Sequence, residues 1–177
     1  MKHIILILIL IQTSVQEKMT IFNFEKESSA NGWYVVNDGV MGGLSQGQFS
    51  VENNLAVFRG EVSTDNNGGF TMIQNQFNTV VTDKCAAFVI KVKGDGKDYQ
   101  FRVKSDKYSR HSYVYQFSTN GEWQEISIPF SGLVPRFRGR SMDMPNFDGS
   151  QIEEIAFLIG NKRDESFELF IHKIKAE

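Results

Sequence analysis

Apolar and polar residues alternate along most of this chain in short runs, which is the pattern of β-strands with one buried face. The run LAVFRGEV at 55–62 is a clear example. Such runs recur at intervals of about 8–12 residues between turn signals, a spacing typical of all-β domains. We expect strands at 20–24, 33–36, 48–51, 55–62, 70–77, 87–93, 99–104, 112–117, 123–128, 155–159 and 167–174.

This set of short strands predicts an all-β domain, an antiparallel β-sandwich for which a jelly roll is the natural arrangement. Strands that are apolar at alternate positions need a second sheet to cover them. No stretch keeps the 3.6-residue period of a helix. The nearest is FDGSQIEEIAFLIG, where Ile152 and Ile155 are compatible with a short helical turn before a strand.

The first 18 residues, MKHIILILILIQTSVQEK, differ from the rest of the chain. A basic start precedes the apolar run Ile4–Ile11, which is too short to cross a bilayer as a helix but suits a signal-peptide core. We therefore expect a leader at 1–18, one domain at 19–177, no transmembrane span, and export to the periplasm or extracellular space. The alternative is an upstream start codon, with a cytoplasmic protein that begins at Met19 and reaches membranes only through a partner.

Composition narrows the function classes. The net charge is −2 over 177 residues, so the chain lacks the basic field that nucleic-acid binding needs. The single cysteine, Cys85, excludes an intramolecular disulfide and a cysteine-based zinc site, and we expect it to be a buried thiol. Neither His111 nor His172 lies near a nucleophile motif. We expect no enzymatic activity, no cofactor and no metal.

The segment GVMGGLSQG at 39–47 is rich in glycine, yet it carries three apolar residues. It lacks the Lys-Ser/Thr pair of a phosphate-binding loop. It also lacks the several carboxylates of an EF-hand calcium loop, because Asp38 is the only one. We expect Gly42 and Gly43 to turn through positive φ or to permit a close backbone approach. Two interpretations of the three apolar residues stay open: they tuck under the loop and cap the core, or Met41 or Leu44 is exposed as an adaptable contact surface for a partner. These residues are Val40, Met41 and Leu44.

Two further turns contain paired glycines. KGDGK at 93–97 lies between two alternating runs and predicts a hairpin turn. TDNNGGF at 64–70 predicts a plain turn, although the side chains at 65–67 could also bind calcium together with backbone carbonyls. The residues expected to shape these two loops are Gly68, Gly69, Gly94, Asp95 and Gly96.

The segment PRFRGR places Arg136, Arg138 and Arg140 at alternate positions, which would all face one way in an extended chain. Such a face is either simply solvated or a binding surface for carboxylates, which guanidinium groups grip in bidentate fashion. We expect Arg138 to be half-buried and paired with an acid such as Asp38.

Five segments, in this order, resemble the CIA30 family, whose members are similar to an assembly factor of respiratory NADH:ubiquinone oxidoreductase (complex I). They are WYVVNDGVMGGLSQGQF, FRGEVSTDNNGGF, VKGDGKDYQFRVK, WQEISIPFSGLVPRFRGR and IEEIAFLIGNK. The resemblance runs from about residue 21 to 174, although STDNNGG is more polar than the usual SLENNGG. Mitochondrial members carry a transit peptide where this chain has a signal-like leader. The signature positions are Trp33, Asp38, Gly39, Val40, Met41, Gly42, Gly43, Ser45, Gly60, Gly68, Gly69, Phe70, Gly94, Asp95, Gly96, Tyr99, Arg138 and Gly139.

The resemblance implies a galactose-binding-domain-like jelly roll and a non-enzymatic, protein-binding assembly factor or chaperone that holds an assembly intermediate. The candidate partner-binding residues are Asp38, Val40, Met41, Gly42, Gly43, Ser45, Arg136, Arg138 and Arg140.

The alternative is a carbohydrate-binding module, because many sugar binders share this fold. A sugar site needs an exposed aromatic platform, whereas Trp33 and Trp123 lie within strand patterns and are expected in the core. Exposure of either ring at a loop end would favour a sugar ligand, and an apolar patch beside Arg138 would favour a protein.

Overall fold

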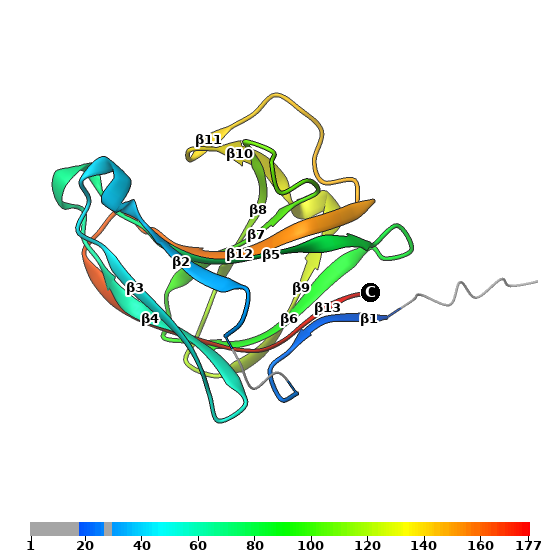
Figure 1. Ribbon diagram of the computed structural model, residues 1–177, viewed down its shortest axis with the longest axis horizontal. Helices are drawn as coiled ribbons and strands as arrows, with labels where there is room; N and C mark the ends of the chain where they lie inside the picture. Colours follow the sequence, from blue (N-terminus) through cyan, green and yellow to red (C-terminus); the bar gives the residue numbers. More distant parts are fainter. Residues whose placement is uncertain (1–17, 27–29) are drawn as a thin grey trace, which may run out of the picture.

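The computed structural model describes residues 18–26 and 30–177, so the expected leader lies outside the described residues except for Lys18. Two antiparallel sheets pack face to face (Figure 1). The six-stranded sheet has the order β3-β4-β13-β6-β9, with β1 beside β13. Its strands are β1 Met19–Asn23, β3 Gln46–Glu52, β4 Leu55–Val62, β6 Ala87–Gly94, β9 Trp123–Pro129 and β13 Glu165–Ala176.

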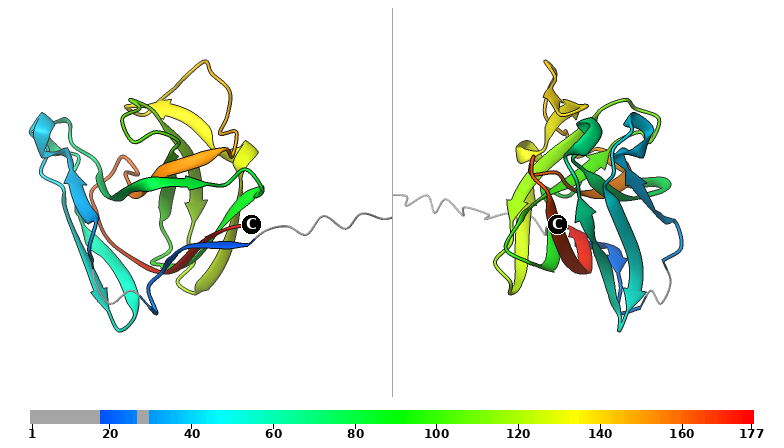
Figure 2. Two further views of the ribbon diagram at one scale, coloured as in Figure 1. Left: turned by 45° about the vertical axis from the view of Figure 1, so that its right-hand side comes forward. Right: turned by 90° about the vertical axis from the view of Figure 1, so that its left-hand side faces the viewer.

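The seven-stranded sheet has the order β11-β10-β8-β7-β12-β5-β2. Its strands are β2 Trp33–Asn37, β5 Thr71–Val81, β7 Asp98–Lys104, β8 Ser112–Ser118, β10 Val134–Phe137, β11 Arg140–Ser141 and β12 Gln151–Ile159. Three short 3-10 turns complete the fold, namely η1 Asp38–Met41, η2 Asp65–Asn67 and η3 Phe130–Gly132. The sandwich is curved, and the loops that join the strands gather at its ends (Figure 2).

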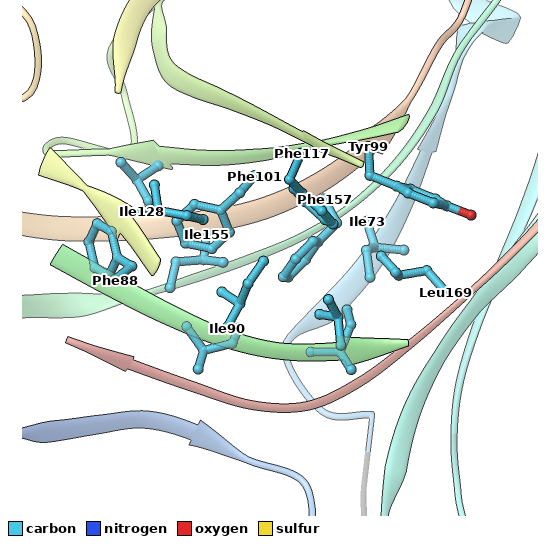
Figure 3. Close-up of a cluster of buried hydrophobic side chains, with 14 of the residues drawn as sticks. Ile73, Phe88, Ile90, Tyr99, Phe101, Phe117, Ile128, Ile155, Phe157 and Leu169 are labelled. Carbon is cyan, nitrogen blue, oxygen red and sulfur yellow. The ribbon is translucent and has the colours of Figure 1, made fainter. Parts of the chain in front are cut away.

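Aromatic and aliphatic side chains together fill the space between the sheets (Figure 3). Phe88 of β6 lies 5.4 Å, centroid to centroid, from Phe101 of β7, which in turn lies 5.5 Å from Phe157 of β12. All three side chains are fully buried. Each occupies an inward position of the alternating pattern, so the alternation read from the sequence is the one that forms the core.

All eleven expected strands are present, and the sandwich itself is confirmed. The helical turn expected around Ile152 is wrong, because β12 already begins at Gln151. Ile152 and Ile155 are both fully buried. A register shift in the pairing of β12 with β5 interrupts strict alternation between Ile152 and Glu154, and the resulting spacing of three imitates a helix. Strands β10 and β11 were not expected.

Candidate functional site

Two glycine-rich loops lie side by side at one end of the sandwich (Figures 1 and 2). The first, residues 38–45, follows β2 and contains η1. The second, residues 63–70, follows β4 and contains η2. We call them the loop pair. Both hold signature positions of the family resemblance, so the loop pair is the first place to look for a site.

The carboxylate of Asp38 joins the two loops. Asp38 is 3% exposed, and its Oδ1 accepts a hydrogen bond from the backbone N–H of Ser45 at 3.1 Å. Its Oδ2 accepts from the Ser45 hydroxyl at 2.5 Å and, across the gap, from the N–H groups of Gly69 at 2.7 Å and Phe70 at 3.3 Å. The Ser45 Oγ also accepts from the N–H of Ser63 at 3.0 Å. One buried carboxylate therefore ties both loops to each other.

These contacts decide the charge state of Asp38. Burial by itself raises the pKa of the carboxyl, but the hydrogen bonds from Ser45, Gly69 and Phe70 outweigh it and hold the pKa below its usual value of 3.8. The side chain is therefore an anion at neutral pH, with its lone pairs already occupied by the protein. Asp38, a candidate partner-binding residue, has its carboxylate turned into the loop pair.

Two glycines leave room for that carboxylate. A Cβ on Gly43 would lie 2.3 Å from the Asp38 carboxyl carbon, and one on Gly68 would lie 2.6 Å from its Oδ2. The two alternatives expected for these glycines divide between them: Gly42 has positive φ, +86°, whereas Gly43, whose φ lies outside the left-handed region, permits a close approach. Gly43 is needed for space and Gly42 for conformation.

Two apolar residues of the first loop, Val40 and Leu44, face solvent. Val40 is 98% exposed and Leu44 is 56% exposed, so the interpretation that they cap the core is wrong and the contact-surface interpretation fits. The side chain of Met41 lies outside the described residues. Two exposed apolar side chains on one short, braced loop are available to contact a partner.

The second loop is a turn that depends on asparagine. Asn66 and Asn67 have φ values of +54° and +61°, a left-handed conformation that asparagine tolerates better than most residues. The loop is also anchored from outside, because Asp164 accepts from the N–H and the hydroxyl of Thr64 at 2.7 and 2.6 Å. No group of three or more His, Cys, Asp or Glu residues able to hold a metal ion occurs among the described residues.

The hairpin expected at 93–97 is wrong. The segment is a turn, with φ +84° at Gly96, but it joins β6 of the six-stranded sheet to β7 of the seven-stranded sheet, and these two strands do not pair. Asp95 in this turn accepts from the hydroxyl of Tyr99 at 2.8 Å, from the Lys97 ammonium at 2.5 Å and from the N–H of Glu168 at 3.0 Å. The turn is thereby tied to β13.

The extended arginine face is wrong. Arg138 and Gly139, with φ +49° and +76°, form a two-residue turn between β10 and β11. Because Phe137 pairs with Arg140 and Arg136 with Ser141, Arg136 and Arg140 lie on opposite faces. In the sequence, the only sign of this turn is the glycine that follows Arg138. The alternation of arginines suggested an extended segment instead.

The expected pair of Arg138 with Asp38 is also wrong. Arg138 is exposed, and its guanidinium lies 5.4 Å from the ring centroid of Phe137. Arg140 is exposed too, whereas Arg136 is half-buried. The Asp38 carboxylate already has four donors from its own loop pair.

The remaining residues singled out by sequence divide between core and surface. Trp33 is buried as expected, but Trp123, the first residue of β9, is 42% exposed and meets the His172 ring edge-on at 6.1 Å. Cys85 is half-buried, not buried. The Nε2 atom of His172 lies 3.0 Å from Oε1 of Glu25.

A glycine comparison tests the role of Asp38 in the loop pair. Gly43→Ala should lower the free energy of unfolding by about 1–3 kcal/mol, because the new Cβ displaces a carboxylate held by four hydrogen bonds. Gly39→Ala, in the same loop, is the matched control and should be neutral, because its added Cβ would have no atom within 4 Å. Chemical denaturation measures both. Equal midpoints for the two variants would contradict the steric role.

Acid titration tests the charge of Asp38. Because the folded pKa is lowered, the carboxylate stabilises the fold fully above pH values near 4, and this contribution disappears as the pH falls through the folded pKa. Asp38→Asn should therefore cost about 1–3 kcal/mol at pH 7 and progressively less in acid. Asp83→Asn, at an exposed carboxylate, should show little difference at any pH. An Asp38→Asn deficit that stays constant down to pH 2 would refute the assignment.

Comparison with solved structures identifies proteins that share this fold. A family 11 carbohydrate-binding module from Clostridium thermocellum, solved with a β-1,3-1,4-mixed-linked tetrasaccharide, superposes with a TM-score of 0.65 at 18% identity, covering 90% of this chain and 94% of the module. The agarase AgWH50C gives a TM-score of 0.60 at 10% identity, over 92% of this chain and 25% of the enzyme. Both likenesses concern the fold, which is the expected galactose-binding-domain-like jelly roll.

The sequence comparisons identify the family. Mouse mitochondrial complex I intermediate-associated protein 30 is 25% identical over 190 residues, which covers 89% of this chain and 55% of the mouse protein. An uncharacterized protein of Schizosaccharomyces pombe is 34% identical over 98 residues, covering 48% of this chain and 45% of its own length. The chain thus spans about half the length of these curated relatives. The family model described as complex I intermediate-associated protein 30 matches residues 22–171, and the chain belongs to this CIA30 family.

Proposed function

We propose that this protein is a non-catalytic binding protein that holds a protein partner, an intermediate in the assembly of respiratory complex I. The observation that carries the proposal is the exposure of Val40 and Leu44 on the braced loop pair. Membership of the CIA30 family supports the class of partner. Within residues 18–26 and 30–177, no helix has the length and apolar character to cross a membrane.

The loop pair has the physical properties of a contact surface. Exposed apolar side chains gain free energy when a partner removes them from water, at about 25 cal/mol per Å². A segment that is already ordered loses less conformational entropy on binding than a flexible one. The hydrogen bonds of Asp38 order this segment before any partner arrives. Val40 and Leu44 are therefore proposed as the apolar anchors of the contact.

The ionisable groups that the sequence singled out also support a binding role. Asp38 is engaged within the loop pair, and His172 is engaged by Glu25. The Asp38 carboxylate, occupied by four donors, is not left to transfer protons to a bound substrate. Arg138 and Arg140 stay predicted as auxiliary partner contacts for carboxylates, since both remain exposed on the β10–β11 hairpin.

A complementation experiment tests the assembly role. Deletion of the gene in the source organism should reduce fully assembled complex I on native gels, and the wild-type chain should restore it. A Val40→Ser, Leu44→Ser variant should restore markedly less while it melts at the wild-type temperature, because both changes affect exposed side chains. Val81→Ser, at a residue 55% exposed, is the matched control. Normal complex I in the deletion strain would refute the proposal.

Carbohydrate binding is the second candidate, favoured by the exposure of the Trp123 ring. This tryptophan closely follows the turn at Asn120–Gly121 and lies on the outer face of the six-stranded sheet. Aromatic rings with one open face are the usual platforms for sugar rings.

Affinity electrophoresis in gels that contain mixed-linkage β-glucan tests this candidate. Binding would retard the wild-type chain, and Trp123→Ala should then abolish the retardation. Tyr108→Ala, which removes another exposed ring at 84% exposure, is the control and should be retarded normally. If the glucan does not change the mobility of the wild-type chain, this candidate is rejected for that polymer. The assembly proposal would not be affected.

A further inference from the structure

A polar hollow of about 530 Å³ lies on the outer face of the seven-stranded sheet. Its floor is formed by β7 and β8, and its walls by the β10–β11 turn at Gly139 and the β12–β13 turn at 160–163. Gln100 of β7 pairs directly with Gln116 of β8, and both face outward because their strand neighbours Tyr99 and Phe117 point into the core. The hollow shares no residue with the loop pair.

Two guanidinium groups in this hollow lack partners for part of their hydrogen-bonding capacity. The Nε atoms of Arg102 and Arg136 are buried and have no hydrogen-bond partner. Among the described residues, no carboxylate forms an ion pair with Arg136. A buried donor without an acceptor costs about 1–3 kcal/mol, so each such atom requires an explanation. A ligand in the hollow would not reach the Nε atoms, which are closed off from solvent, but an oxyanion there would supply acceptors to the rest of the two arginine side chains, which line the hollow.

The protein's own carboxylates do not fill this need. Glu154 is a buried acid close to Arg102, and it is already shared by Lys104 at 3.3 Å and by the Gln76 amide at 2.7 Å. Burial lowers the pKa of Arg102, Glu154 opposes this change, and the nearby charge of Arg136 adds to it. The positive charges of Arg102 and Arg136 thus lie close together. The one carboxylate near them, Glu154, also forms an ion pair with Lys104.

The other acids and bases around the hollow leave the balance positive. Asp98, at its edge, accepts from the Ser118 hydroxyl at 2.6 Å, and Arg163 is paired with Glu165 at 2.9 Å. Lys162 lines the hollow without an ion pair among the described residues. Arginine pairs are suited to bind the two oxygens of a carboxylate or phosphate in bidentate fashion.

Amide side chains complete the lining. Gln116 is exposed and its side chain makes no hydrogen bond within the described chain, and Gln100 has only a long side-chain contact of 3.5 Å from Arg102. Each amide offers donors and an acceptor, which is the combination that hydroxyl groups require. The volume falls within the range of about 300–1,000 Å³ for small-molecule sites and is small for a folded protein segment.

We infer that this hollow binds a small hydroxylated oxyanion, a sugar unit that carries a carboxylate or a phosphate, with Arg102 and Arg136 on the anion and Gln100 and Gln116 on the hydroxyls. The site is independent of the assembly role, which rests on the loop pair, and of neutral-glycan binding at Trp123 on the other sheet. Its failure would leave both of those proposals untouched.

Titration calorimetry with four probes tests the inference: D-glucuronate, glucose 6-phosphate, glucose and inorganic phosphate. At least one charged sugar should bind about tenfold or more tightly than glucose and than inorganic phosphate, because the guanidinium groups and the amides act together. Preference for glucuronate identifies the carboxylate source, and preference for glucose 6-phosphate identifies the phosphate source.

Variants assign the binding to named residues. Arg136→Gln should weaken the charged sugar about tenfold or more and keep the wild-type melting temperature, because this guanidinium has no carboxylate partner to lose. Arg140→Gln, exposed on the same hairpin and outside the hollow, is the matched control and should bind normally. Gln116→Ala, at an exposed side chain, should weaken the charged sugars while leaving inorganic phosphate unchanged.

Several results would overturn the inference. They are equal affinity for glucose and both charged sugars, inorganic phosphate binding as tightly as the tighter-binding charged sugar, wild-type affinity in Arg136→Gln, and no heat from any probe at millimolar concentration. If Arg136→Gln melts early, the Gln116→Ala comparison decides the question, since that side chain forms no hydrogen bond within the described chain that folding needs.

Discussion

The buried carboxylate of Asp38 is the constraint on which the loop end of this sandwich depends. A charge taken out of water is costly unless hydrogen bonds replace those of the solvent. Here the donors come from Ser45 in the same loop and from the backbone of Gly69 and Phe70 in the other loop. Neither loop can satisfy the carboxylate alone, so the two loops are expected to order together.

This single requirement explains several residues that otherwise look unrelated. Gly43 and Gly68 are small because any Cβ would occupy the volume of the carboxylate. Asn66 and Asn67 let the second loop turn so that the amide of Gly69 can point back. These positions lie in two of the five segments that resemble the CIA30 family. The shared signature thus largely specifies a braced pair of loops. Partner specificity must then reside in side chains that the brace leaves outside, such as Val40 and Leu44.

The strands could be predicted from the sequence because the alternation of apolar and polar residues is a local property. The contacts between the loops could not be predicted in this way. Leu55–Val62 was located to the residue, since one face must be apolar wherever the sheet covers the core. The partners of Asp38 lie up to 32 residues away, and nothing local announces such a contact. The Arg138–Gly139 turn was missed because charge alternation suggested an extended chain, although two positive φ values close it after two residues. Trp123 was misplaced because the strand edge leaves its ring open to solvent.

The same jelly roll presents three chemically different surfaces, and this separation bears on how family membership should be interpreted. The loop pair is apolar at its tip, the outer face of the six-stranded sheet carries Trp123, and the hollow on the other sheet is cationic. Because the sandwich core holds each surface independently, a change at one need not disturb the others. A CIA30 chain can therefore keep the loop pair of its family while its sheet faces acquire ligands of their own. Arg102 and Arg136, whose buried Nε atoms find no acceptor within the described chain, are the residues at which such a second task is most visible.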